Sequence, residues 1–566
     1  MSSLFQFGPF TLDSRARRLS RAGTTIPLQP RVFDTLHLLL RNNDRVVGKE
    51  ELLDTVWKGR VVTDNALARV ISALRRALED SPRESRYIRA IPRVGYRFVG
   101  DVTATEAATG EPASLTALAV LPFTPLQGGG ADQALEYGLA DTLSSRLSNL
   151  RGLVVRPFNH GLPAEAAVSP MDTGRRLGAD YCLCGSVQRS RDQIRVTATL
   201  MAIRDGSSLW SASFDQRLAD IFEVQDAICE RILREIAPRL RKRIPHAAET
   251  NVEAYRAFLE GRLFLGRHTP GDTRLALERF EAALDADPAY APAWAGIADC
   301  HDSLGTLGED PQTHFEAARR AAARALALDP DLPEALCVLA KVAWQYEWDW
   351  AKAERLFEQA LQSYPNRADL HIAYSDFCCY MRYGDRAIEH AEKAMAVDPV
   401  SPWVSSLMAQ ACYMHDRNEE AIEHARRTLE LAPGFPFAHF FHGMALMRRG
   451  EADAAIEEIE RAAASGRGDF FAVLGNWYAL TGRRAEAEQI LAAMQAAETP
   501  APPIAFVGLH LGLGNLDEAR EAFRRSIDAH DWHILILHAD PLMIEAARGT
   551  DLPELLEPLN LPEDRA

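Results

Sequence analysis

The sequence predicts a multidomain protein with an α+β head, an α/β middle part and an all-α repeat array. Three observations along its 566 residues support this division. The first hundred residues are basic, whereas the rest of the chain is acidic. Strands and helices alternate up to about residue 240. Beyond residue 250, an apolar pattern recurs with a period of about 34 residues, which is typical of paired helices.

The overall composition excludes several classes of protein. Hydrophobic residues make up 47% of the chain and charged residues 25%, so a largely disordered protein is excluded. The most apolar uncharged stretch, residues 112–130, is broken by Pro122 and Pro125 and predicts no membrane span. The N-terminus lacks the basic start and the apolar core of a signal peptide. We therefore expect a cytoplasmic protein that makes no contact with a membrane.

Cysteine and histidine spacing predicts no metal and no cofactor. The eight cysteines include the close pairs Cys182/Cys184 and Cys378/Cys379, and neither spacing suits a zinc site. The sixteen histidines include no His-Glu-x-x-His motif. Reduced thiols with a structural role are the expected state.

The charge is divided unevenly between the head and the remainder of the chain. Residues 1–100 contain 18 Lys and Arg against 10 Asp and Glu, a net charge of +8. The remaining residues carry −24, which gives the whole chain its formal charge of −16. A basic head on an acidic body predicts a polyanionic partner for the head alone.

The head reads as strands, then helices, then a hairpin. Period-two alternation predicts the strands, and apolar residues at helical spacing predict the helices. The expected elements are strands at 5–7, 10–12 and 18–20, helices that begin at Pro30, at Lys49 and just after the capping pair Thr63-Asp64, and a hairpin over residues 87–98 that turns at 92–94.

The third helix of the head carries two different faces. Its buried stripe is expected to consist of Leu67, Ile71, Leu74 and Leu78. The other face is polar and cationic, with Asn65, Arg69, Ser72 and Arg76 on it and Arg75 at its margin. Arginine and asparagine side chains suit base edges and phosphates in a major groove. A solvated helix with cations near its C-terminus is the alternative.

The order of these segments resembles the winged-helix effector domain of the OmpR/PhoB-type regulators. The resemblance covers about residues 5–99 and rests on LQPRVFDTLHLLLRNNDRVVGKEELLDTVW, NALARVISALRRAL and YIRAIPRVGYRF. It implies a winged helix-turn-helix whose third helix reads the major groove and whose wing touches the minor groove. The loop at 58–63, from Lys58 to Thr63, matches the family's loop for RNA polymerase. The implied DNA-contacting positions are Asn65, Arg69, Ser72, Arg75 and Arg76, with Arg93 in the wing.

The middle of the chain is expected to be a linker followed by an α/β domain. Residues 101–116 are small and polar, and predict the linker. Residues 117–240 alternate between strands and helices. The segments AVLPF, LGADYCLCGSV and DGSSLWSASFD resemble the amino-terminal α/β domain of TolB, which has no established active site. The glycines at 128–130 lack the lysine and Ser/Thr of a phosphate-binding loop. We therefore expect no enzyme here.

The acidic part, residues 250–550, contains a repeated motif. A Leu or Met stands four residues before a proline, and small residues such as Ala276 and Ala353 mark close helix crossings. A 34-residue unit of two helices resembles the tetratricopeptide family and predicts an all-α solenoid of seven or eight repeats. The motif pairs are Leu284/Pro288, Leu326/Pro330, Leu361/Pro365, Met395/Pro399 and Leu429/Pro433.

A solenoid of this kind is expected to leave a long concave surface for a peptide or a partner protein. Five tryptophans are candidate binding anchors, although packing between repeats is the alternative for each. They are Trp344, Trp348, Trp350, Trp403 and Trp477.

Together these parts predict a DNA-binding transcriptional regulator, an activator by analogy. Its domains are expected at residues 1–100, 117–240 and 250–550. The expected partners are double-stranded promoter DNA, RNA polymerase and a protein or peptide on the repeats, with further copies of the chain as an option. A tetratricopeptide scaffold or adaptor is one alternative, and a small-molecule sensor acting through the middle domain is another.

Overall fold

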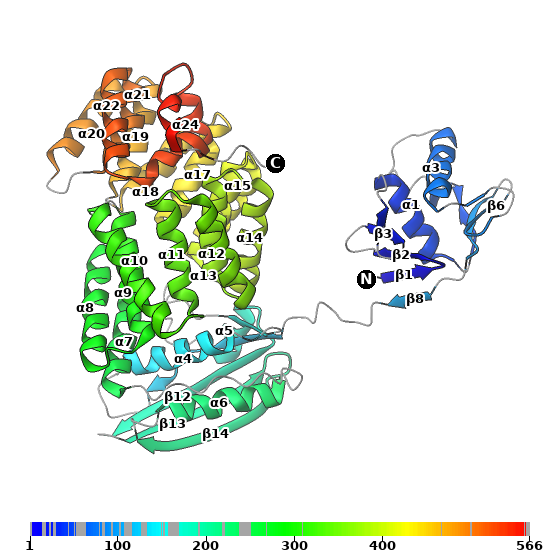
Figure 1. The fold of residues 1–566 in the computed structure, drawn as a ribbon, viewed down its shortest axis with the longest axis horizontal. Coiled ribbons are helices and arrows are strands. Elements are labelled where there is room, and N and C mark those ends of the chain that lie inside the picture. Colours follow the sequence, from blue (N-terminus) through cyan, green and yellow to red (C-terminus); the bar gives the residue numbers. More distant parts are fainter. Residues whose placement is uncertain are drawn as a thin grey trace. The chain divides into compact units, whose positions relative to one another are not determined.

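The protein is described from a computed structural model that divides into two compact units, Met1–Ser114 and Leu115–Ala566 (Figure 1). We call them the head and the body. The structure describes residues 3–561 apart from 14–17, 22–23, 27–29, 44, 50, 53–63, 79, 82–84, 92–93, 101–102, 107–115, 126–132, 149, 151–152, 157–168, 191–192, 218–220, 237–250, 268, 308–309, 466, 498–500 and 560.

The head contains two antiparallel sheets. The first has the strand order β4-β3-β2-β1-β8, and the second has the order β5-β7-β6. Strand β8 lies inside the stretch that the sequence predicts as a linker. Its backbone pairs with β1, and two β-branched threonines suit it to a strand although it lacks apolar alternation. The strands are β1 Ser3–Phe7, β2 Phe10–Asp13, β3 Arg18–Arg21, β4 Thr24–Ile26, β5 Val47–Gly48, β6 Ile88–Ile91, β7 Gly95–Phe98 and β8 Thr103–Glu106.

Two helices of the head, α1 (Pro30–Arg41) and α3 (Asp64–Ala77), pack their apolar sides into one core. Leu36 of α1 and Leu74 of α3 are completely buried in it. The predicted helix over residues 49–56 lies largely outside the described residues. The winged helix-turn-helix expectation for the head is confirmed in its sheet, helix and hairpin order.

The first part of the body is a mixed sheet with the order β11-β9-β12-β13-β14. Strands β11, β9 and β12 are parallel, whereas β12, β13 and β14 are antiparallel. Helices α4 and α6 cover one face, and α5 covers part of the other. The elements are β9 Thr116–Val120, β10 Thr124–Pro125, α4 Gln133–Ser148, β11 Leu153–Arg156, α5 Pro170–Arg176, β12 Tyr181–Ser190, β13 Gln193–Ala202, β14 Ser208–Arg217 and α6 Ile221–Ile236.

The second part of the body is a solenoid of helix pairs, from α7/α8 to α21/α22 (Figure 1). The all-α repeat prediction is therefore confirmed. The helices are α7 Val252–Leu265, α8 Pro270–Ala286, α9 Ala291–Thr306, α10 Pro311–Leu328, α11 Pro333–Gln345, α12 Trp350–Ser363, α13 Ala368–Tyr380, α14 Gly384–Val397, α15 Pro402–Met414, α16 Asn418–Leu431, α17 Pro436–Arg448, α18 Ala452–Ala463, α19 Gly468–Leu480, α20 Arg484–Ala496, α21 Pro503–Leu513 and α22 Leu516–Asp528.

The motif residues of the repeats lie where the pattern places them. Pro288 follows the end of α8, and the four later prolines follow α10, α12, α14 and α16 in the same way. Ala276 and Ala353 are fully buried. Phe280, also fully buried, lies against Gly261 and Gly296 of the neighbouring helices, where a Cβ atom would come within 2.7 Å of its ring. Glycine at these two positions therefore permits the close crossing of α7, α8 and α9.

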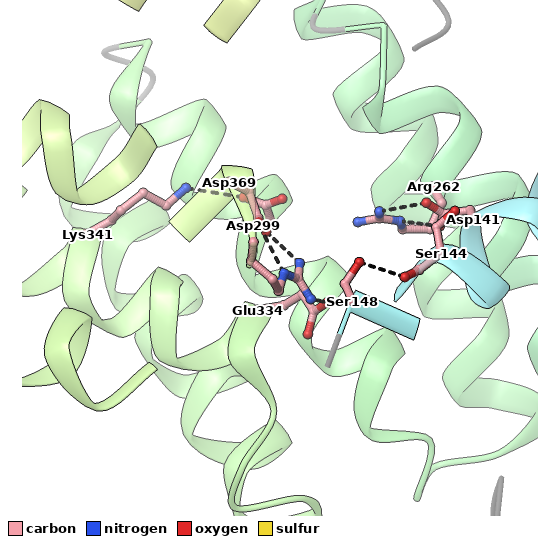
Figure 2. Close-up of polar contacts among 9 residues, drawn as sticks. Asp141, Ser144, Ser148, Arg262, Asp299, Glu334, Lys341 and Asp369 are labelled. Carbon is pink, nitrogen blue, oxygen red and sulfur yellow. Dashed lines mark hydrogen bonds and ion pairs between the residues drawn. The ribbon is translucent and has the colours of Figure 1, made fainter. Parts of the chain in front are cut away.

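The mixed sheet packs directly on the solenoid. Arg262 of α7 forms an ion pair with Asp141 of α4, with 3.2 Å between Nε and Oδ2 (Figure 2). At the other end of the sheet, Asn366 donates a hydrogen bond of 3.1 Å to the carbonyl of Leu153. The predicted domain limits at 117–240 and 250–550 stay predictions, because the two parts form one compact unit here.

A C-terminal strap, residues 531–559, returns to the earlier repeats. It consists of η2 (Trp532–Leu535), α23 (Ile536–Ala539), α24 (Pro541–Ala546) and η3 (Pro553–Leu559). The indole of Trp532 packs edge-on against Trp344 of α11 at 5.3 Å between ring centroids. Tyr413 of α15 donates a buried hydrogen bond of 2.9 Å to Asp540 of the strap.

The strap changes the expectation of an open concave surface, because it covers parts of α11, α13 and α15. All five candidate anchors pack against other parts of the chain. Trp348 stacks on His530, Trp350 donates to the carbonyl of Leu559, and Trp403 packs on Phe437. Trp344 and Trp477 are almost fully buried. Packing is thus the role that the structure gives to these tryptophans.

Within the described part of the chain, no helix combines the length and apolar character needed to cross a membrane. The eight cysteines are free thiols, and all are buried except Cys184, which is partly exposed.

Candidate nucleic-acid interface

Helix α3 has a buried face and an exposed face, as its sequence predicts. Its apolar stripe is no more than 2% exposed, and this stripe consists of Leu67, Ile71 and Leu74, with Leu78 just beyond the helix end. Arg69, Ser72 and Arg76 are exposed on the other side. Among the described residues, none is a partner of the guanidinium groups of Arg69 and Arg76.

Two of the predicted DNA-contacting side chains and the predicted polymerase loop lie outside the described part of the structure. Asn65 lies in the first turn of α3, but its side chain is outside the described part of the structure. Arg93 of the wing and the loop at 58–63 also lie outside the described residues. Their roles stay predictions.

Arg75 is turned toward the hairpin rather than outward. Its Nη2 atom donates a hydrogen bond of 3.0 Å to the carbonyl of Ile88 in β6. Asp80 completes the connection, because its carboxylate accepts hydrogen bonds from the amides of Arg86 at 2.7 Å and Ile88 at 2.8 Å. The amide of Asp80 in turn donates to the carbonyl of Arg75. This network fixes the end of α3 against the hairpin.

The hairpin places two further arginines side by side. Arg89 of β6 and Arg97 of β7 are directly opposite each other in the antiparallel register, and both are exposed. Like charges directly opposite on a sheet are destabilising unless an anion lies between them. In the sheet of the body, by contrast, Arg195 of β13 lies directly opposite Asp215 of β14. The two form an ion pair, with 2.5 Å between Nε of Arg195 and Oδ1 of Asp215. The arginine pair of the wing therefore suits a phosphate.

This pair borders a shallow hollow of about 460 Å³ on the head. Sequence reasoning missed the pair, although the predicted turn contained the signal: residues 89 and 97 are equally far from Arg93 and must face each other in a hairpin centred there. The hollow is lined by Asn43, Val46, Arg89, Ile91, Arg97, Phe98, Val99 and Gly100.

Among the described residues, no group of three or more His, Cys, Asp or Glu side chains has the arrangement of a metal site.

Comparison with known proteins identifies the head and the repeats. Residues 23–98 match the family model described as "Transcriptional regulatory protein, C terminal", and residues 270–313 match the model described as "Tetratricopeptide repeat". The transcriptional regulator HilA of Salmonella typhimurium is 26% identical over 400 residues, which cover 70% of each chain. The putative adenylate cyclase 3 of Rhizobium meliloti is 27% identical over 185 residues, 32% of each chain.

The head also resembles the transcriptional activator CadC of Escherichia coli, which is 30% identical over 116 residues, 20% of this chain and 23% of that protein. The solved DNA-binding domain of CadC covers 18% of this chain and 96% of that chain, at 30% identity and a TM-score of 0.17.

The chain is a DNA-binding transcriptional regulator. Its DNA-binding domain is of the OmpR/PhoB type, and its C-terminal part consists of tetratricopeptide repeats, a module that implies protein partners.

Proposed function

We propose that the protein activates transcription by binding promoter DNA with the exposed face of α3 and with the arginine pair of the wing. The observation that carries the proposal is the pair of exposed guanidinium groups, Arg69 and Arg76, on the side of α3 opposite its buried stripe. Seven residues, about two helical turns, separate them. They therefore lie along one side of a helix that a major groove can admit.

The two sets of cations serve different tasks in this proposal. Arg69 and Arg76, with Ser72 between them, read base edges or the adjacent phosphates in the major groove. Arg89 and Arg97 neutralise phosphate beside it, which relieves their mutual repulsion. Arg75 holds the wing at its angle to α3 and acts through position rather than contact.

The remaining expectations complete the proposal. RNA polymerase is contacted through the loop at 58–63, and the head acts in the cytoplasm, where bacterial DNA lies. The body has no catalytic role, although one relative is named a putative cyclase. An adaptor in which DNA binding is vestigial would have no use for two exposed arginines on α3 and two more on the wing.

Removal of the α3 cations is expected to weaken DNA binding and relax its sequence preference. Arg69→Ala with Arg76→Ala should cost about 1–3 kcal/mol for each bidentate base contact that is lost. The measurement is the affinity of the full chain for operator and for scrambled duplex. Arg204→Ala with Arg324→Ala removes the same charge from exposed positions of the body and is the control. Equal losses in the two double variants would contradict the proposal.

Removal of the wing pair is expected to act on affinity alone. In Arg89→Ser with Arg97→Ser, the slope of log affinity against log salt should fall by about one for each lost phosphate contact, while discrimination between operator and scrambled duplex is kept. A salt titration with both duplexes measures the two effects separately. An unchanged slope would show that the wing arginines do not meet phosphate.

A further inference from the structure

The two edges of the mixed sheet in the body differ in how they are covered. At one edge, the short strand β11 lies against the solenoid. There Arg156 Nη1 donates a hydrogen bond of 2.8 Å to the carbonyl of Val397, and Asn366 donates one of 3.1 Å to the carbonyl of Leu153. At the other edge, the ten-residue strand β14 pairs only with β13 among the described strands. Figure 1 shows β14 at the margin of the sheet that is remote from the solenoid.

Strand β14 carries little of the protection that exposed edges usually have. Proteins block such edges with lysine, proline, β-bulges, inward-pointing charges or very short strands. A register shift opposite Leu200 and Met201 leaves Leu209 as a bulge at the start of β14, and the strand is regular from Trp210 onward. The segment from Trp210 to Phe214 contains no charge and no proline.

Burial also decreases toward this edge. On the face covered by α6, Val196 and Ala198 of β13 are completely buried, whereas Ala212 and Phe214 of β14 are partly exposed. The apolar side chains of β14 on this face are therefore only partly covered. A further strand beside β14 would extend the sheet and cover it.

We propose that β14 pairs antiparallel with β14 of a second copy of the chain, about a two-fold axis at Ser213. This register is self-complementary. It places the small Ala212 opposite the large Phe214 twice and the hydroxyl of Ser211 opposite the carboxylate of Asp215 twice. Only Ser213 faces itself, and no two like charges are opposed.

The regular strand is also electrically neutral as a whole, because Asp215 and Arg217 are its only charged residues. Two copies can therefore approach without net repulsion along the edge, although the whole chain carries −16. Pairing would join the two sheets into one and bring two DNA-binding heads into a single molecule. Association through one interface raises the effective concentration of the second head at a repeated operator.

Cysteine cross-linking tests both the pairing and its register. Directly opposed residues of antiparallel strands have Cα atoms about 4.5–5.5 Å apart, which suits a disulfide. In the full chain, Ser213→Cys is expected to form a disulfide-linked dimer of twice 62.7 kDa under mild oxidation. Ser211→Cys is the matched control, because two copies of residue 211 would be about 13 Å apart in this register.

Sedimentation of the wild-type chain without DNA gives the second readout. A dimer with a Kd in the micromolar range is expected. Ser213→Lys should raise this Kd about two- to fivefold, since two lysines would face each other. Thr197→Lys adds the same charge directly opposite Ser213 on β13, one strand in from the edge, and should leave the dimer intact. A wild-type monomer, or equal cross-linking at residues 211 and 213, would overturn the proposal. Because no DNA is present, failure of this test leaves the DNA-binding proposal separately testable.

Discussion

Replacing Trp532 by alanine is expected to release the C-terminal strap and destabilise the body by about 3–5 kcal/mol. The indole is 8% exposed and packs edge-on against both Trp344 and Tyr380, which themselves stack on each other at 5.6 Å. Removing it leaves a cavity among aromatic rings and takes away the contacts of the indole with Trp344 of α11 and Tyr380 of α13. Urea unfolding followed by circular dichroism measures the loss.

Hydrogen exchange distinguishes release of the strap from a general weakening. In Trp532→Ala, protection should fall in the strap and in α11 and α13, and should be retained in the mixed sheet. Phe471→Ala is the control, because Phe471 is a large apolar side chain that is 37% exposed on α19. Unchanged exchange in the strap would show that other contacts hold it in place.

Replacing Glu458 by alanine is expected to destabilise the α17/α18 repeat by about 3 kcal/mol. The carboxylate lies between the two helices, where it accepts a hydrogen bond of 2.6 Å from His439 and forms an ion pair with Arg461. Its loss leaves a buried imidazole N–H without an acceptor. Urea unfolding and hydrogen exchange of α17 and α18 measure the effect. Glu457→Ala, whose side chain is 68% exposed, should change stability by no more than about 0.5 kcal/mol.

The same carboxylate predicts how stability depends on pH. Burial alone would raise the pKa of Glu458, but the imidazoles of His442 and His439 outweigh it and lower this pKa to about 2. The ordinary value is 4.5, so the unfolded chain binds the proton more readily. The contribution of Glu458 is therefore complete above about pH 4.5 and is lost as the pH falls toward 2. In Glu458→Ala, the free energy of unfolding should therefore lack this decrease between about pH 4.5 and pH 2.

Sequence reasoning predicted those features that depend on local pattern. The two faces of α3 follow from helical spacing, so Leu67 and Ile71 could be assigned to the core and Arg69 and Arg76 to the surface. The repeats were predictable because each proline ends a helix at a fixed position. These signals are carried by residues close together in the sequence.

Features that depend on distant residues were not predictable in this way. Nothing in the sequence around Arg75 shows that its guanidinium reaches the carbonyl of Ile88, and this contact exists only because the hairpin folds back on α3. Strand β8 depends on pairing with β1, about a hundred residues earlier. The contact between Trp532 and Trp344 depends on how far the solenoid curves.

One signal of medium range was present but was not recognised. Positions 371 and 390 lie 34 residues before Ser405 and His424, and 68 residues before His439 and Glu458. All three pairs of positions lie on the two helices of one repeat. The side chains meet in two of them, His371 with His390 at 2.9 Å between Nδ1 atoms and His439 with Glu458, whereas Ser405 donates to the backbone carbonyl of His424. A polar pair recurring with the period of the repeat therefore indicates a cross-helix contact, as its apolar counterpart indicates a core.

During synthesis, the surfaces that the strap covers are made well before the strap itself. Trp344 leaves the ribosome about 190 residues before Trp532, which at 5–20 residues per second is an interval of about 10–40 s. During that time the surfaces of α11 and α13 that the strap will cover are bare, while the head has long been synthesised. A message cut short before the codons of the strap would therefore yield a DNA-binding head attached to a body that lacks the strap.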